Sequence, residues 1–315
     1  MAGDNLQDLR FRFLQVNEFH VQAPDDSRFS YDGAHERVTW MCQAMRGEGP
    51  LTQLDFVLGL GDYVNGRSIE DLYLEQALFR DLLGELPCPF YPVPGNHDIG
   101  QREGDPQWET PYLEAFGLRA ANYRFTVDGI HFIMLNNSAT AHCDEAVART
   151  RAAWLRSALE SCAGEPVILC CHVPLLPMRE QSVLVKSCGF PAWRTQEPEC
   201  LQLVRENADS ILAVLSGHLH LTAAVRDASV WHIDIAGLAS YPSDYALYSV
   251  YPDRIEVEVK QLPPELLAPN SSLHGRPRHE VNYTDNKHPT YQQYVMGLDC
   301  ERRLTIELAH TLADG

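Results

Sequence analysis

Five short apolar runs in this chain each end in side chains that can bind a metal or move a proton. The runs are Phe11–Val16, Asp55–Leu60, Phe90–Val93, Val167–Cys171 and Ile211–Leu215. The side chains that follow them are Glu18 and His20, Asp62 and Asn65, Asn96 and His97, His172, and finally His218 and His220. Helical stretches lie between the runs, so we predict an α/β core with parallel strand pairing and right-handed crossovers. The carboxyl ends of strands form the ligand crevice of such sheets, and the five loops are therefore expected to meet at one site.

The elements between and after these runs point to more than one kind of strand pairing. Helical periodicity predicts helices over His35–Arg46, Ile69–Glu85, Ala146–Glu160 and Pro198–Asn207. A hairpin is predicted where Asp128-Gly129 separates Asn122–Val127 from Ile130–Asn136. Three later strands are predicted at Val230–Ala236, Ala246–Tyr251 and Arg254–Lys260. Antiparallel strands beside parallel ones favour a mixed or double sheet over a simple Rossmann fold.

The region after these strands is harder to assign. Gln261–His288 is rich in Pro, Asn, Ser and His, and is either a linker to a small tail or a loop draped over the body. The tail is predicted to contain a short helix near Pro289–Met296 and a strand at Arg303–Leu308. We expect one domain over residues 1–262, with a C-terminal appendage over residues 263–315 packed on or near it. Its histidines, His274, His279 and His288, are expected to be surface or packing residues; the alternative is that they cap the predicted site.

Charge limits the partners of the chain. Its 315 residues carry 25 Lys and Arg against 43 Asp and Glu, a formal net charge of −18. This charge argues against a nucleic-acid polymer or an anionic membrane as partner, but a local metal site would still allow a small phosphorylated substrate. The nine cysteines include no C-x-x-C pair, the first residues show no signal peptide, and the longest apolar stretch is too short to span a membrane. We therefore expect a cytoplasmic protein; its oligomeric state does not follow from the sequence.

The donor types restrict the metal. Imidazole combined with carboxylate and amide oxygens suits borderline divalent ions such as Fe, Mn, Co, Ni or Zn. Seven donors are too many for one tetrahedral ion, but they suffice for two ions that share a carboxylate. Asp62 is the natural bridge because the Gly61 turn lets the backbone approach closely. Two such ions serve in-line displacement at phosphorus.

The ordered motifs E-F-H, G-D-Y-V-N-G, G-N-H-D, a lone His and G-H-L-H run from residue 18 to residue 220. This series resembles the calcineurin-like metallophosphoesterases, and its first motif is similar to the branch of cyclic-nucleotide phosphodiesterases and related small phosphoesterases. The resemblance implies the metallo-dependent phosphatase fold, a four-layer α/β/β/α sandwich with two mixed β-sheets. It also implies an enzyme with two divalent metal ions (Mn, Fe or Zn) that hydrolyses phosphodiesters, such as a cyclic nucleotide or a related small substrate, by attack of a metal-bridging hydroxide. Two alternatives stay open: a phosphomonoesterase or protein phosphatase with the same centre, and a non-catalytic scaffold with this fold.

The resemblance also assigns roles to single residues. It implies that metal one is held by Glu18, His20, Asp62 and His220, and that metal two is held by Asp62, Asn96, His172 and His218. His97 would remain without a metal, stabilise the phosphoryl group and protonate the leaving oxygen. Asn65 matches the position whose side chain orients this histidine.

One position departs from the family pattern. The first carboxylate of the family is an aspartate, and Glu18 stands in its place. Because glutamate is one methylene longer, the same backbone would push metal one outward or force another rotamer. We expect Glu18 to bind metal one after a backbone adjustment; the alternative is a charged strand end in water.

Overall fold

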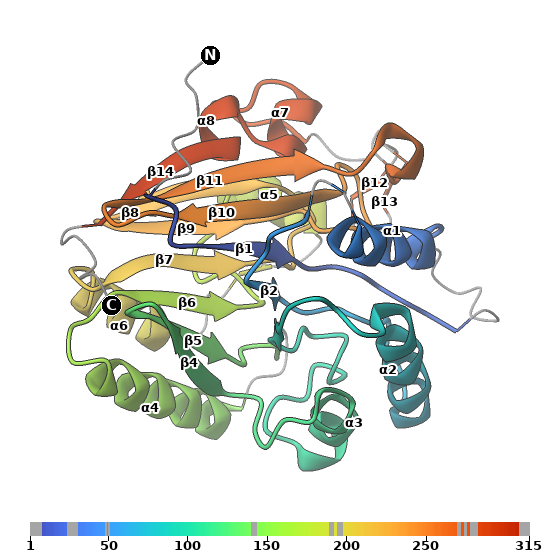
Figure 1. Ribbon diagram of the computed structural model, residues 1–315, viewed down its shortest axis with the longest axis horizontal. Helices are drawn as coiled ribbons and strands as arrows, with labels where there is room; N and C mark the ends of the chain where they lie inside the picture. Colours follow the sequence, from blue (N-terminus) through green and yellow to red (C-terminus); the bar gives the residue numbers. More distant parts are fainter. Residues whose placement is uncertain are drawn as a thin grey trace.

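The computed structural model describes residues 8–308 except 24–30, 48, 50, 140–143, 189–191, 194–197, 270–271, 274–275 and 278–282. Two six-stranded mixed sheets form its centre (Figure 1). The first sheet has the order β14 (Arg303–Glu307), β11 (Arg254–Gln261), β10 (Asp244–Val250), β1 (Phe11–Val16), β2 (Phe56–Gly59) and β3 (Phe90–Pro92). The second has the order β4 (Tyr123–Val127), β5 (Ile130–Leu135), β6 (Val167–Cys171), β7 (Ile211–Ser216), β9 (Val230–Asp234) and β8 (Ala223–Asp227). A short ribbon pairs β12 (Ser272–Leu273) with β13 (Arg276–Pro277).

Helices cover the outer faces of both sheets, which gives the expected α/β/β/α sandwich. On the first sheet lie α1 (Ala34–Arg46), α2 (Ile69–Leu83) and α3 (Pro106–Phe116), whose apolar side chains join one cluster with the outward residues of that sheet. On the second lie α4 (Glu145–Ser161) and α6 (Pro198–Glu206). No helix in the described part of the chain is long and apolar enough to cross a membrane.

A core of large side chains separates the two sheets. Phe13 of β1 stacks on Tyr248 of β10 with ring centroids 4.4 Å apart, and meets Phe132 of β5 edge-on at 5.5 Å. These three side chains are fully buried. Aromatic pairs of this kind add about 0.5–1.5 kcal/mol each beyond the area that they bury, so the two sheets are firmly joined beneath the loops that follow their strands.

The five apolar runs form strands as predicted, and they divide between the sheets. β1, β2 and β3 are parallel neighbours in the first sheet, while β6 and β7 are parallel neighbours in the second. The predicted hairpin is also present as β4 and β5, and both turn residues have positive φ (Asp128 50°, Gly129 79°). The other predicted helices and strands begin and end within two residues of the observed ones.

Several elements were not predicted. They are α3, α5 (Gln181–Cys188), β8, and the short C-terminal elements β12, β13, α8 (Asp299–Arg302) and the 3-10 turn Pro264–Leu266. For α3 the signal was present, because the Asp105 side chain accepts a hydrogen bond from Gln107 N at 3.0 Å and Pro106 begins the helix. For β8 the run is short and alternating, and it becomes a strand by pairing with β9 at the sheet edge.

The C-terminal part of the chain returns to the main body. After the 3-10 turn Pro264–Leu266 come α7 (Tyr291–Met296) and α8 (Asp299–Arg302), and β14 then pairs antiparallel with β11. The strand predicted at Arg303–Leu308 is therefore an edge strand of the first sheet. His288 is buried, whereas His274 and His279 lie outside the described residues. The domain boundary at residue 262 stays a prediction.

Candidate metal centre

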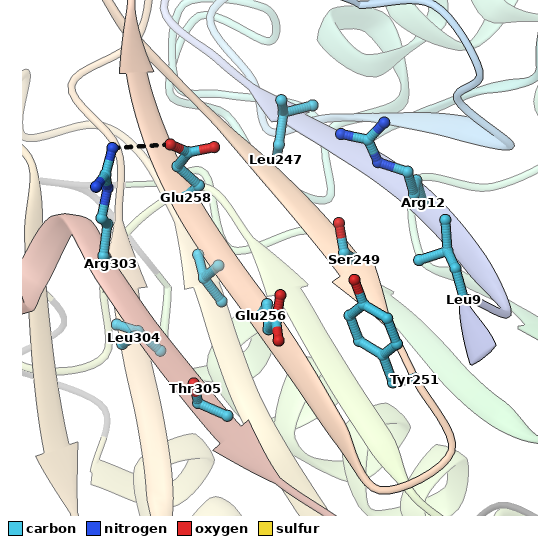
Figure 2. A pocket seen from close by; sticks show the side chains of 11 residues that line it. Leu9, Arg12, Leu247, Ser249, Tyr251, Glu256, Glu258, Arg303, Leu304 and Thr305 are labelled. Atoms are coloured by element: carbon cyan, nitrogen blue, oxygen red, sulfur yellow. Dashed lines mark hydrogen bonds and ion pairs between the residues drawn. The ribbon is translucent and has the colours of Figure 1, made fainter. Parts of the chain in front are cut away.

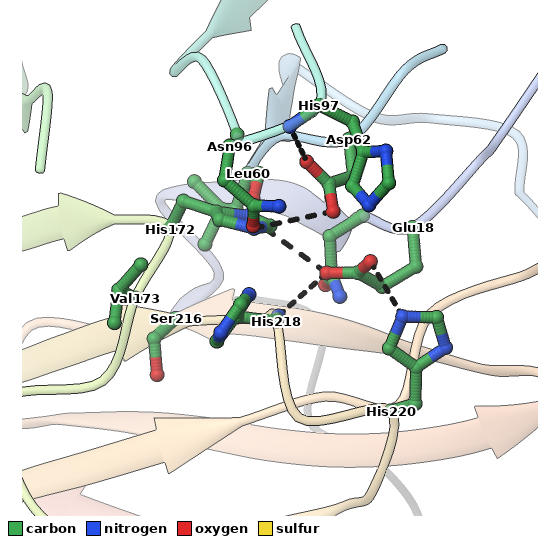
Figure 3. A network of polar contacts seen from close by, with 12 residues as sticks. Glu18, Leu60, Asp62, Asn96, His97, His172, Val173, Ser216, His218 and His220 are labelled. Carbon is green, nitrogen blue, oxygen red and sulfur yellow. Dashed lines mark hydrogen bonds and ion pairs between the residues drawn. The ribbon is translucent and has the colours of Figure 1, made fainter. Parts of the chain in front are cut away.

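The structure brings together all eight side chains that follow the strand ends as candidate ligands or acid, and Figure 3 labels all of them except His20. Seven are at most 5% exposed and His97 is half-buried. The ligand atoms of seven of them, all except Asn96, fall into three groups, and the atoms of each group lie within 4.8 Å of one another: Glu18 with His20 and His220, Asp62 with His172 and His218, and His20 with Asp62 and His97.

Glu18 lies inside the cluster rather than in water. Its Oε2 is 3.0 Å from Nε2 of both His20 and His220. Its Oε1 accepts a hydrogen bond of 2.5 Å from the backbone N–H of His218. The longer side chain is accommodated by Gly237, where a Cβ would lie only 2.5 Å from the Glu18 Cβ. Because Gly237 has no side chain, the longer side chain of Glu18 fits beside it.

Asp62 belongs to two of the three groups, one with His20 and His97 and the other with His172 and His218. Its Oδ2 is 3.8 Å from His20 Nε2 and 3.4 Å from His172 Nε2, and His172 Nε2 is in turn 3.1 Å from Asn96 Oδ1. Oδ1 of Asp62 accepts the backbone N–H of His97 at 2.9 Å. Asp62 is thus the carboxylate that borders both groups of donors, as a bridging ligand must.

The imidazoles are held by their far nitrogens. Nδ1 of His172 donates to the carbonyl of Leu60 at 2.7 Å, and Nδ1 of His220 lies 2.5 Å from the Ser240 hydroxyl. Nδ1 of His97 donates to the carbonyl of Asn65 at 2.8 Å. Such contacts fix the tautomer; at His172 and His220 they also turn Nε2 toward the carboxylates, which is the arrangement of a metal-ligating histidine.

Asn65 contacts His97, the histidine that it is expected to orient, through its backbone. It is the backbone carbonyl of Asn65 that orients His97, whereas the side-chain Oδ1 lies 3.0 Å from Nδ1 of His20. The Asn65 amide also donates to Gln22 at 2.6 Å. The loop after Asp62 has turned far enough for one residue to hold two histidines, and this turn could not be inferred from spacing.

The backbone around the cluster is strained. Among the described residues, eleven other than glycine have positive φ, and five of these are candidate ligands: Glu18, His20, Asp62, His218 and His220. Each such residue costs roughly 1–3 kcal/mol and persists only where its surroundings hold it. Gly61 and Gly95 allow the loops to approach, since a Cβ there would lie 2.5 Å from His172 Nδ1 and 2.1 Å from Asp62 Oδ1.

The two buried carboxylates of the cluster need compensating positive charge. Burial alone would raise the pKa of Glu18 and Asp62, but the neighbouring histidines outweigh it and lower the pKa of Asp62 to about 2 and that of Glu18 well below its usual value. Burial likewise opposes the charged form of His172, yet Asp62 and Glu18 raise its pKa to about 10. In the described chain, neither carboxylate is ion-paired with a lysine or arginine. Protons on the histidines or bound cations must supply the compensation.

The residues present fit a pair of divalent ions. The donors are imidazole nitrogens, two carboxylates and an amide oxygen; the far nitrogens of three histidines have hydrogen-bond partners, and glycines leave room for close approach. This agreement concerns the type and placement of the donors. The identity of the metals is not fixed by it.

Asp98 is a supporting residue that the sequence analysis missed. Its two carboxylate oxygens accept backbone N–H groups of Asp62 (2.7 Å), Tyr63 (2.9 Å), Val64 (3.3 Å) and Gly95 (2.6 Å), so it joins the loops after β2 and β3. Burial and the charge of Asp62 raise its pKa to about 8, whereas the backbone donors favour the carboxylate. Its place in the G-N-H-D motif was the available signal.

A hollow of about 510 Å³ lies elsewhere, on the face of the first sheet that points away from the second (Figure 2). Arg12, Glu256, Glu258 and Arg303 are among its lining residues. None of the candidate ligands reaches it.

A family model and a curated relative match the chain. The family model, described as calcineurin-like phosphoesterase, matches residues 11–221. The glycerophosphodiester phosphodiesterase GpdQ of Enterobacter lignolyticus is 24% identical over 168 residues, which cover 53% of this chain and 56% of that protein. The match thus spans about half the length of the curated relative.

Solved structures share the fold at low identity. A dimetal phosphatase from Danio rerio is similar with a TM-score of 0.62 and 16% identity, covering 81% of this chain and 97% of that one. GAP50, described as the anchor in the inner membrane complex of Plasmodium, is similar with a TM-score of 0.57 and 14% identity, covering 91% and 93%.

Proposed function

Because this chain belongs to the calcineurin-like phosphoesterase family, we propose that it is a phosphoric ester hydrolase that cleaves small phosphodiesters at a dinuclear metal centre. Metal one would be held by Glu18, His20, Asp62 and His220. Metal two would be held by Asp62, Asn96, His172 and His218. The proposal is supported mainly by the position of Asp62, which borders both groups of donors.

The cations would polarise the phosphoryl oxygens and supply a hydroxide at neutral pH. The chain itself supplies the groups that hold the phosphoryl centre and move protons. With Nδ1 of His97 donating to the Asn65 carbonyl, its Nε2 is the nitrogen left to face a substrate. Burial lowers the pKa of His97. An anionic phosphoryl group beside Nε2 would favour the protonated ring, which could then protonate the departing oxygen.

We propose a diester rather than a monoester as the substrate because the curated relative is named as a glycerophosphodiester phosphodiesterase. The test compares bis(p-nitrophenyl) phosphate with p-nitrophenyl phosphate, using protein loaded with Mn²⁺ or Zn²⁺. We expect kcat/KM to be higher for the diester. A higher value for the monoester would favour the phosphomonoesterase alternative.

Two variants separate catalysis from a scaffold role. Asp62→Asn and His97→Ala should each abolish most of the diesterase activity. The control His131→Gln, which removes an imidazole of β5 that contacts Glu165, should not. Loaded wild-type protein that hydrolyses neither model ester would overturn the proposal and leave the scaffold alternative; GAP50, which shares this fold, is described as an anchor. Metal identity is measured by elemental analysis of the purified protein; Mn, Fe and Zn stay the candidates.

A small phosphorylated substrate follows from the same proposal, and glycerophosphodiesters and cyclic nucleotides are the first two classes to assay. Wild-type protein that cleaves only cyclic nucleotides would exclude the glycerophosphodiester class. The cytoplasmic location stays a prediction.

A further inference from the structure

The turn that carries His218 and His220 is buried on both of its sides. His220 Nε2 lies 3.0 Å from Glu18, and His218 belongs to the donor group of Asp62. The intervening Leu219 and the following Leu221 are fully buried in a separate apolar cluster. The other buried members of that cluster include Met178 and Leu184, which follow β6, and C-terminal residues Tyr283, Tyr291, Tyr294 and Val295. The C-terminal segment is therefore the outer support of the turn.

Thr222 ends the turn, and each of its polar groups is fixed. Its backbone N–H donates to the carbonyl of Val295 at 2.8 Å, and its carbonyl accepts from Nη2 of Arg179 at 2.6 Å. Its hydroxyl donates to Oδ2 of Asp244 at 2.6 Å. Thr222 and Asp244 are fully buried, so these contacts are not shared with bulk water.

Two arginines connect these contacts to the C-terminal helices. Arg302 of α8 makes a two-pronged contact with Asp244, at 2.6 and 3.0 Å, and also donates to the carbonyl of Met296 at 2.8 Å. Arg179 is 3.3 Å from Glu301 of α8. Planar, bidentate arginine contacts of this kind resist rotation more than single hydrogen bonds do.

The turn needs such support because its backbone is strained. His218 and His220 have φ of 74° and 53°, conformations that cost roughly 1–3 kcal/mol each. Gly297 lets the C-terminal segment approach, since a Cβ there would lie 2.9 Å from the carbonyl oxygen of Thr222. Without outside contacts the turn would relax, and both imidazoles would leave their positions together.

We propose that residues 283–302 are part of the metal-binding apparatus, with Arg302 and Arg179 as positioning residues that hold the His218–His220 turn. This inference rests on the proposed dinuclear centre. It assigns the C-terminal segment a role that the motifs, which end at residue 220, do not reach. Because His218 would hold one ion and His220 the other, disturbing the segment should weaken both metal sites at once.

The test titrates metal-free protein with Mn²⁺ by calorimetry and records the visible spectrum with Co²⁺. Arg302→Met should lower the affinity for both ions by roughly 10–100-fold, the range for residues that orient ligands, and should alter the Co²⁺ spectrum. Arg302→Lys should restore part of the affinity. The matched control is Arg303→Gln. The Arg303 side chain, next to Arg302 in the sequence, is 78% exposed and ion-paired with Glu258 on the sheet surface (Figure 2). The Arg303→Gln protein should bind metal like wild type.

A second variant keeps the test decisive if Arg302→Met does not fold. Thr222→Val preserves the side-chain shape and removes only the hydroxyl that bonds Asp244, and it should weaken both sites in the same direction. Wild-type protein that binds no ion would overturn the proposed centre itself. Wild-type protein that binds two ions, with variants that match its affinity and Co²⁺ spectrum, would overturn the role of the C-terminal segment alone. Lower thermal stability with unchanged metal affinity would do the same.

Discussion

Asp98→Asn tests whether one buried carboxylate holds two loops of the centre together. In the structure Oδ2 of Asp98 accepts the N–H groups of Asp62 and Gly95, and Oδ1 accepts those of Tyr63 and Val64. Asparagine offers one acceptor oxygen and replaces the other by an NH₂ group. In either orientation of the amide, at least two buried N–H donors lose their acceptor, at a cost of about 1–3 kcal/mol each. The free energy of unfolding should therefore fall by roughly 2–6 kcal/mol.

The assay is urea denaturation of the Mn²⁺-loaded protein at a fixed metal concentration, followed by far-UV circular dichroism. The control is Asp227→Asn, which loses an exposed ion pair with Arg205 and should change stability by less than about 1 kcal/mol. Metal affinity should also fall in Asp98→Asn, because Asp62 and Asn96 lie on the two loops that it joins. If Asp98→Asn matched wild type within about 0.5 kcal/mol at a pH above 8, where the raised pKa of Asp98 still leaves it ionised, Asp98 would not act as a carboxylate acceptor and the reasoning would be refuted.

Three further predictions concern the same centre. If the proposed centre holds two ions per chain, Glu18→Gln should lower the metal content to one by elemental analysis, because the charge between His20 and His220 is lost; an unchanged count would show that Glu18 is not a ligand. Gly237→Ala should lower stability by about 1–3 kcal/mol in thermal melts, since φ is 76° and the new Cβ would lie 2.4 Å from a backbone oxygen; an unchanged melting temperature would contradict this. Metal affinity should rise from pH 6 to pH 8, because Asp62 and Glu18 raise the pKa of His172 to about 10 against the effect of burial and an ion must displace its proton. Calorimetry in two buffers of different ionisation enthalpy measures that proton release, and affinity independent of pH would refute it.

The sequence predicted much of this protein, because strand ends and ligand types are local properties. Apolar runs of strand length followed by Asp, Asn or His indicated seven side chains that lie close together in the structure, and parallel pairing brings their loops to one edge of each sheet. The hairpin at Asp128-Gly129 followed from turn chemistry alone. Glu18 also lies in the cluster, despite the extra methylene.

Only the tertiary structure decided how these side chains are held. Asn65 orients His97 by its carbonyl and meets His20 with its side chain, which depends on a loop conformation that spacing does not encode. Arg302 supports the His218–His220 turn through Asp244 and Thr222, and these contacts join segments about eighty residues apart. Motif residues are set by the reaction and occur at fixed local positions. The contacts that hold the strained backbone form between distant segments when the sheets pack, so no periodicity in the sequence predicts them.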